Sequence, residues 1–230
     1  MTRRQVKYGF IQQGGDGDYM FEQAPQKKVK LYGANLTWNM FYDSHEGADK
    51  TADRLARLGY NVVRLHTLDS MADWAQGIFV QNKSTTPQLN AARLDSLDYL
   101  IAKLKSKGIY ITIDIFQLYD FKEIPGLGNY ADGAKSAYLL PLLPQALNMW
   151  KAIANTWLSH VNPYTELPLK NDPVLIGVSP WNESLLLNMG LSGMTNDLRG
   201  YMLEDFNDYL IAHGKSAITS FPSNYWNAAR

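Results

Sequence analysis

The stretch Ile109–Phe116, with the sequence IYITIDIF, decides the fold. Except for Thr112 and Asp114, its side chains are apolar or aromatic, and such a run is typical of a strand buried in a parallel sheet. Gly108 directly precedes it, and glycine is well suited to the position just after a helix. The stretch therefore predicts an α/β fold in which strands of a parallel sheet alternate with helices.

The same alternation of short strands and longer helices extends in both directions from this stretch. Apolar or β-branched runs predict further strands at Val29–Leu36, Asn61–His66, Val174–Ser179 and, as a fifth, Ala217–Phe221. Apolar residues at helical spacing predict helices from Ser44 to about Leu58, over about Ala91–Lys107, over roughly Leu142–His160, and from Thr195 to Gly214. Long loops follow two of the strands, which is where α/β proteins gather functional residues.

The first 28 residues have a different pattern. Tyr8–Gln12 and Tyr19–Gln23 predict two short strands, and the glycines of Gly14–Gly17 predict a hairpin turn between them. We expect this hairpin to cap one end of a single domain that spans residues 1–230, because no linker or low-complexity tract divides the chain.

Composition excludes several classes of function. The 230 residues carry 22 basic and 22 acidic side chains, so the net charge is zero, which argues against binding nucleic acid or an anionic membrane. The absence of cysteine excludes disulfides, a cysteine nucleophile and thiolate metal sites. No apolar run is long enough to span a membrane, and no apolar segment of a signal peptide follows the basic start MTRRQVKYGF, so the compartment stays open.

Polar or charged side chains close the first four predicted strands, and their gathering at the carboxyl ends indicates a site, because buried polar groups are costly unless they are bonded. These side chains are Asn35, Arg64, His66, Asp114, Gln117, Asn182 and Glu183. Structural alternatives stay open for four of them. Arg64 and Asp114 could form an ordinary ion pair, and His66 could be a hydrogen-bonded histidine without a ligand. Glu183 could be a loop carboxylate.

Other catalytic motifs are missing from the sequence. It contains no P-loop, no dinucleotide-binding glycine pattern after a strand and no G-x-S-x-G elbow. Its four histidines lack the spacing of a zinc site. We therefore expect no metal and no cofactor.

Four segments together resemble the clan A glycoside hydrolases, and most of all family 5, the cellulase-like (β/α)8 barrels. They are KLYGANLTW (30–38), SHEGADKTADRLARLGYNVVRLH (44–66), LDSLDYLIAKLKSKGIYITIDIF (94–116) and LIGVSPWNES (175–184). The most specific part is the pair Asn182–Glu183, supported by Arg64. The resemblance implies a cellulase- or endoglucanase-like retaining hydrolase of β-linked polysaccharide in carbohydrate metabolism.

The same resemblance implies the roles of individual residues. Glu183 would be the general acid/base, Asn182 would bind the sugar 2-hydroxyl, and Arg64 would position the nucleophile. A retaining mechanism also needs a second carboxylate about 5 Å from the acid/base. We expect the remaining residues to contribute to substrate binding, the tryptophans by stacking on sugar rings: His66, Asn35, Trp38, Trp74 and Trp181.

The chain departs from the family pattern in two respects. The family nucleophile closes strand seven, whereas this chain reaches only about strand five, so it predicts a partial TIM barrel of about (β/α)4 plus a fifth strand. Gln117 lies near the position where many members carry histidine. Three hypotheses remain: a hydrolase completed by another copy, an inactive remnant that keeps the fold and a sugar-binding cleft, or an unrelated (β/α) protein.

An open half-barrel also predicts self-association. Its two edge strands would expose unpaired backbone groups, and IYITIDIF suggests an apolar inner face that water would otherwise cover. We therefore expect a homo-oligomer, either a closed dimer or a trimer.

Overall fold

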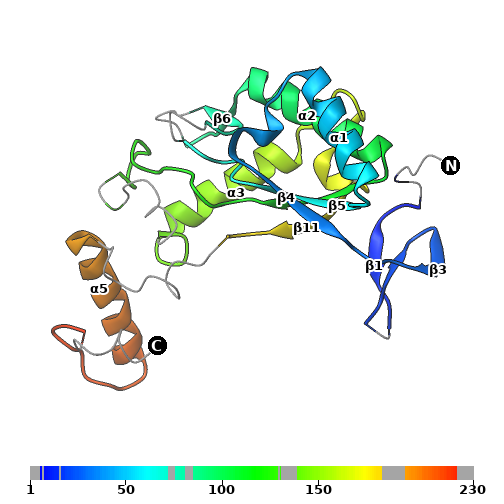
Figure 1. Cartoon of the computed structure of the whole chain (residues 1–230). Helices are drawn as coiled ribbons and strands as arrows, with labels where there is room; N and C mark the ends of the chain where they lie inside the picture. Colours follow the sequence, from blue (N-terminus) through cyan, green and yellow to red (C-terminus); the bar gives the residue numbers. More distant parts are fainter. Residues whose placement is uncertain are drawn as a thin grey trace.

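The computed structural model describes residues 6, 8–15, 17–71, 76–80, 85–128, 130, 139–182 and 195–221. Its centre is a four-stranded parallel sheet, ordered β11-β8-β5-β4 (Figure 1). The strands are β4 (Gly33–Thr37), β5 (Val62–His66), β8 (Tyr110–Asp114) and β11 (Leu175–Ser179). Each strand neighbours the one before it in the (β/α) series, which confirms the predicted α/β fold. The described residues form no closed barrel.

Within the described ranges, four long helices alternate with the strands, close to the predicted bounds. They are α1 (His45–Arg57), α2 (Ala91–Ser106), α3 (Pro144–Leu158) and α5 (Asn196–Ala212). The Ser44 side chain accepts a hydrogen bond from the Gly47 backbone, and Thr195 caps α5 in the same way through Leu198. Buried residues of α1, α2 and α3 share one hydrophobic core with the sheet.

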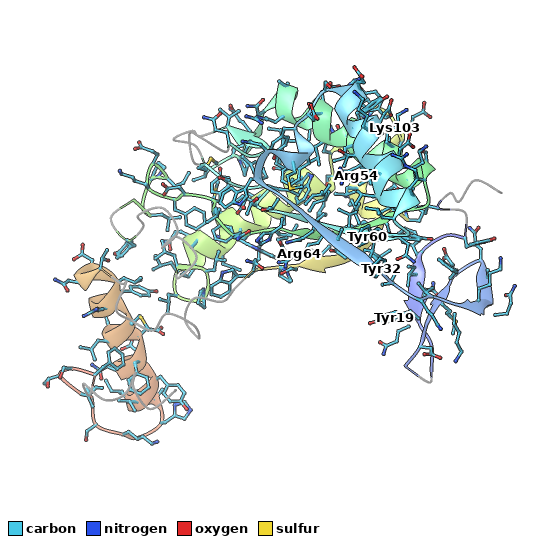
Figure 2. The ribbon with its side chains drawn as sticks, viewed as in Figure 1. Tyr19, Tyr32, Arg54, Tyr60, Arg64 and Lys103 are labelled. Atoms are coloured by element: carbon cyan, nitrogen blue, oxygen red, sulfur yellow. The ribbon has the colours of Figure 1, made fainter. Side chains whose placement is uncertain are left out.

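The two faces of the sheet differ sharply. Side chains facing the helices are fully buried and apolar, among them Val63, Leu65, Ile111 and Ile113. On the opposite face, the register aligns Asn35 with Arg64 and Thr112 in one row, and Thr37 with His66 in the next. Figure 2 shows Arg64 on the side of the sheet away from Arg54 and Lys103, which lie on α1 and α2.

The expectation of an apolar inner face is therefore wrong. Successive side chains of a strand point to opposite faces, so the isoleucines of IYITIDIF turn toward the helices. Thr112 and Asp114, the two polar residues of the stretch, lie on the inner face in register with Arg64 and next to His66. The inner face of the half-barrel is thus polar toward its carboxyl end.

The N-terminal segment forms a small antiparallel sheet of β1 (Ile11–Gln13), β2 (Tyr19–Phe21) and β3 (Ala24–Lys28). The β1–β2 hairpin was predicted, and β3 was not. The Phe21 ring lies 6.1 Å from the ring of Tyr110, the first residue of β8. The small sheet therefore contacts the amino end of the parallel sheet, as a cap would. The single-domain assignment stays a prediction.

The predicted fifth strand is wrong. Residues 217–221 follow α5 without forming a strand. The Asn207 side chain of α5 accepts a hydrogen bond from the backbone N–H of Ile218 at 2.8 Å and donates one to its carbonyl at 2.9 Å. These bonds satisfy the backbone groups that a strand would offer to a neighbour, and they hold the segment against α5, which projects away from the sheet in Figure 1.

Short elements in the connecting segments were not predicted. They are η1 (Trp38–Phe41), β6 (Phe79–Val80), β7 (Gln88–Leu89), β9 (Val161–Asn162), β10 (Leu167–Pro168) and η4 (Leu169–Asn171). The first predicted strand is also shorter than expected, because β4 begins at Gly33. Across the described ranges, every helix is too short or too polar to span a bilayer.

The two-faced sheet predicts unequal costs for two isoleucine truncations. Ile111 is fully buried, whereas Ile211 on α5 is 61% exposed. Ile111→Ala should lower the free energy of unfolding by about 2–5 kcal/mol, because it leaves a cavity in the core. Ile211→Ala should change it by less than about 0.5 kcal/mol. Urea unfolding of both variants measures this, and similar losses would contradict the assignment of faces.

Candidate active site

Asp114 is the centre of the polar cluster on the inner face. Its side chain, at the carboxyl end of β8, is only 2% exposed. Arg64 donates to it through Nε at 3.2 Å and through Nη2, at 2.9 Å to Oδ2 and 3.1 Å to Oδ1. His66 Nδ1 lies 2.5 Å from Oδ2. The ion pair of the structural alternative therefore exists, and it also fixes two predicted site residues beside one carboxylate.

The cluster continues to the end of the fourth parallel strand. Arg64 Nη2 also donates to Asn182 Oδ1, at 2.5 Å. The Asn182 backbone N–H donates to the carbonyl of Phe116 at 3.0 Å, which ties the chain after β11 to the chain after β8. Arg64 and Asn182 lie 118 residues apart in the sequence, and the parallel register places them in contact at the carboxyl ends of the strands.

The remaining predicted residues have different positions. Asn35 is exposed and lies on β4 in register with Arg64. Trp38 begins η1, and its backbone N–H donates to Thr67 Oγ1 at 2.7 Å. Trp181 is partly buried and packs against the hydrophobic core. Glu183 and Trp74 lie outside the described residues.

Two connecting segments have strained backbone beside the cluster. Trp38 has φ 57° and Thr67 has φ 66°, a region that side-chain-bearing residues seldom adopt. The two residues are joined by the Trp38 N–H bond to Thr67, and the hydroxyls of Thr37 and Thr67 lie 3.1 Å apart. Such strain persists only where surrounding contacts fix it, and it is concentrated at functional sites.

Asp69 supports the polar cluster from the loop after β5, and nothing in the sequence predicted this role. It follows β5, is 2% exposed, and accepts backbone N–H bonds from Gln117 at 2.6 Å, Leu118 at 2.9 Å and Tyr119 at 3.0 Å. Burial raises the pKa of Asp69 to about 6, although these backbone donors act in the opposite direction. Asp69 therefore fixes the start of the loop that follows β8.

Gln117 completes the cluster at that loop. Its Nε2 lies 3.0 Å from His66 Nε2. Three polar atoms nearby in the chain are buried without a hydrogen-bond partner among the described residues: Gln117 Oε1, Trp181 Nε1 and Asn182 Nδ2. Buried polar atoms are normally paired, so such atoms suggest positions for water or a ligand hydroxyl. Within the described ranges, no three histidine or carboxylate side chains are grouped so as to hold a metal ion.

Arginine, asparagine and a carboxylate thus meet at the carboxyl ends of neighbouring strands of a parallel sheet. The family model of cellulase, glycosyl hydrolase family 5, matches residues 22–228. The chain therefore belongs to glycoside hydrolase family 5. No curated protein sequence matches it significantly.

Solved structures similar to the chain show the same fold. An endo-1,4-β-mannanase from Rhizomucor miehei has a TM-score of 0.62 at 17% identity, over 90% of this chain and 58% of its own. A family 5 mannosidase from the same organism, in complex with mannosyl-fructose, gives 0.57 at 14%, over 96% and 58%. An endo-β-1,4-mannanase from Thermotoga petrophila gives 0.50 at 17%, over 83% and 42%. The chain thus spans 58% or less of the length of these three proteins.

The burial of Asp69 predicts a pH-dependent contribution to stability. Its pKa rises from an ordinary 3.8 to about 6 on folding, so between these values the folded chain binds more protons than the unfolded chain. The contribution is complete below about pH 4 and is lost as the pH rises through about 6, which lowers the free energy of unfolding by as much as about 3 kcal/mol.

Asp69→Asn is the matched variant, because its amide oxygen can still accept backbone bonds but does not titrate. Urea unfolding of both proteins between about pH 4 and pH 7 measures the difference. The variant should lack this part of the pH dependence, and parallel curves for the two proteins would contradict the prediction.

Proposed function

We propose that the chain contributes the acid/base half of a retaining glycoside hydrolase active site, with Glu183 as the general acid/base. The observation that supports this most directly is the contact between Arg64 and Asn182 at the carboxyl ends of β5 and β11. Asn182 directly precedes Glu183 in the sequence. The backbone N–H of Asn182 donates to the carbonyl of Phe116, so the main chain is fixed at the residue that precedes Glu183.

The chemistry of glycoside cleavage explains the proposed roles. A carboxylic acid must protonate the leaving oxygen, and a second carboxylate must attack the anomeric carbon. Arg64 is already paired with Asp114 through Nε and Nη2, and its Nη1, which has no hydrogen-bond partner within the described ranges, would orient that second carboxylate. Asn182 Nδ2, buried and unpartnered among the described residues, would donate to the sugar 2-hydroxyl. Asn35, His66, Trp38, Trp74 and Trp181 are proposed to contribute to substrate binding.

For the substrate we propose a β-linked polysaccharide, cellulose-like glucan in the first instance. A β-linked mannan is the second candidate, because the structures named above include two mannanases and a mannosidase. The two sugars differ in the configuration at carbon 2, so a contact from Asn182 to the 2-hydroxyl would distinguish them. Parallel assays with soluble glucan and soluble mannan would decide between them.

The alternative to an active hydrolase is a catalytically inactive half-barrel. It would keep the fold and a carbohydrate-binding cleft but lack the second carboxylate. Arg64 and Asp114 would then serve as a structural ion pair only. Binding of oligosaccharide without turnover would favour this alternative.

We further propose that the half-barrel associates with itself, as a dimer or trimer. In the described part of the chain, β4 pairs only with β5 and β11 only with β8, so each has a free edge. Exposed apolar side chains lie at both edges: Tyr32 before β4 is 58% exposed and stacks on Tyr60 (Figure 2), and Val178 on β11 is 42% exposed. Since the inner face is polar, the edges supply the main reason for association.

The proposed acid/base role predicts the effect of Glu183→Gln. Hydrolysis of an activated aryl β-glycoside, or of soluble glucan and mannan, should fall by about a hundredfold or more, because the variant cannot transfer a proton. Glu204→Gln, on the exposed surface of α5, is the matched control and should keep the wild-type rate. Equal rates for wild type and Glu183→Gln would contradict the role.

The free edges predict an oligomer in solution. Light scattering coupled to size exclusion should give a mass of two or three times 26.0 kDa at micromolar concentration. Val178→Lys should reduce the association, because a charged side chain at an edge strand opposes pairing. A well-folded, soluble monomer of wild-type protein would refute self-association.

A further inference from the structure

The cluster contains a chain of hydrogen bonds that reaches beyond the proposed catalytic roles. It starts at Asp69, which accepts backbone N–H bonds from three consecutive residues. These bonds fix the point on the main chain from which the Gln117 side chain extends. The Gln117 side chain then approaches His66, and His66 approaches Asp114. Each of these contacts needs a donor and an acceptor, and the roles together determine which ring nitrogen of His66 carries a proton.

Asp114 determines the protonation of Nδ1, the first of the two ring nitrogens of His66. Arg64 donates to both carboxylate oxygens, so Asp114 acts as an acceptor toward its neighbours. His66 Nδ1, at 2.5 Å from Oδ2, must therefore carry the hydrogen of that contact. This condition alone is satisfied by both neutral and charged imidazole, because both can have a proton on Nδ1.

Gln117 determines the protonation of Nε2, the second ring nitrogen of His66. Its amide nitrogen, which can only donate, lies 3.0 Å from His66 Nε2. An Nε2 that receives this bond has no proton of its own. An imidazolium would require the amide to present Oε1 instead, whereas Oε1 is the buried atom without a partner among the described residues.

We propose that Gln117 is a positioning residue that keeps His66 neutral, with its proton on Nδ1, between Asp114 and the Gln117 amide. Charged side chains around the cluster come from β5 with Arg64, from β8 with Asp114 and from the loop after β5 with Asp69. Two of these three are carboxylates, whereas the Gln117 amide is an uncharged donor. Arg64 then remains the cation paired with Asp114 in the cluster.

A neutral His66 has a consequence for binding. An uncharged imidazole held at both nitrogens offers a fixed flat surface beside Arg64, without adding a second positive charge. This consequence rests on the proposed carbohydrate site, whereas the protonation of His66 rests on the hydrogen-bond geometry alone. The two can therefore fail separately, because protonation is measured without any substrate.

The test is the protonation state of His66, read from the side-chain nitrogen shifts of ¹⁵N-histidine-labelled full chain at pH 7. Only four histidines contribute signals, and His66→Gln assigns the relevant one. Wild type should show one N–H, on Nδ1, and an unprotonated Nε2. Gln117→Glu replaces the donor with a carboxylate, so the ratio of charged to neutral His66 should rise at least about tenfold.

Gln117→Leu is the second variant, because it removes the donor without adding charge. Loss of one hydrogen bond should raise the same ratio by about two- to tenfold, which corresponds to about 0.4–1.4 kcal/mol. Gln145→Glu on the exposed surface of α3 is the control for added charge and should leave the His66 signals unchanged. The proposal is overturned if wild-type His66 carries its proton on Nε2, or if both Gln117 variants match the control.

Discussion

The buried carboxylate of Asp114 is the constraint on which the inner face of this half-barrel depends. A carboxylate that is 2% exposed is costly unless opposite charge and hydrogen bonds surround it. Arg64 and His66 meet that need from one neighbouring strand, two residues apart and therefore on the same face. Arg64 then reaches Asn182 beyond the other neighbour, β11. One carboxylate thus links the carboxyl ends of three strands, and any change in their register would break these contacts.

Much of the fold could be predicted from the sequence, because the strands and helices differ in apolar spacing and end at clear signals. Ser44, Gly108 and Thr195 lie at helix ends as predicted. The two errors have a common cause. The apolar character of IYITIDIF suggested an apolar inner face, although alternation assigns its isoleucines to the helices. Ala217–Phe221 suggested a strand by composition, although Asn207 satisfies the backbone of Ile218 locally. In both cases local composition was misleading, because strand alternation decided the first outcome and the hydrogen bonds of Asn207 decided the second.

The candidate site was only partly predictable for a related reason. Arg64, Asp114 and Asn182 are polar residues at strand ends, so the sequence marked them before their contacts were known. Asp69 carries no such mark, since its role depends on three backbone N–H groups about 50 residues away. The direction of the Gln117 amide is likewise set by its neighbours. Resemblance to a family indicates which side chains do chemistry, whereas the groups that orient them emerge only from the folded chain.

The polarity of the inner face changes how an incomplete barrel should be understood. An apolar interior would make exposure to water very costly and would make closure a condition of folding. Here the helix-facing side carries the hydrophobic core, and the rows that contain Arg64 and His66 tolerate water. The half-barrel can therefore be stable while its edges remain available. The proposed association through the free edges of β4 and β11 would then not depend on the hydrophobic core. Under the proposed self-association, the core would govern folding and the edges would govern assembly, so the two would be separate steps.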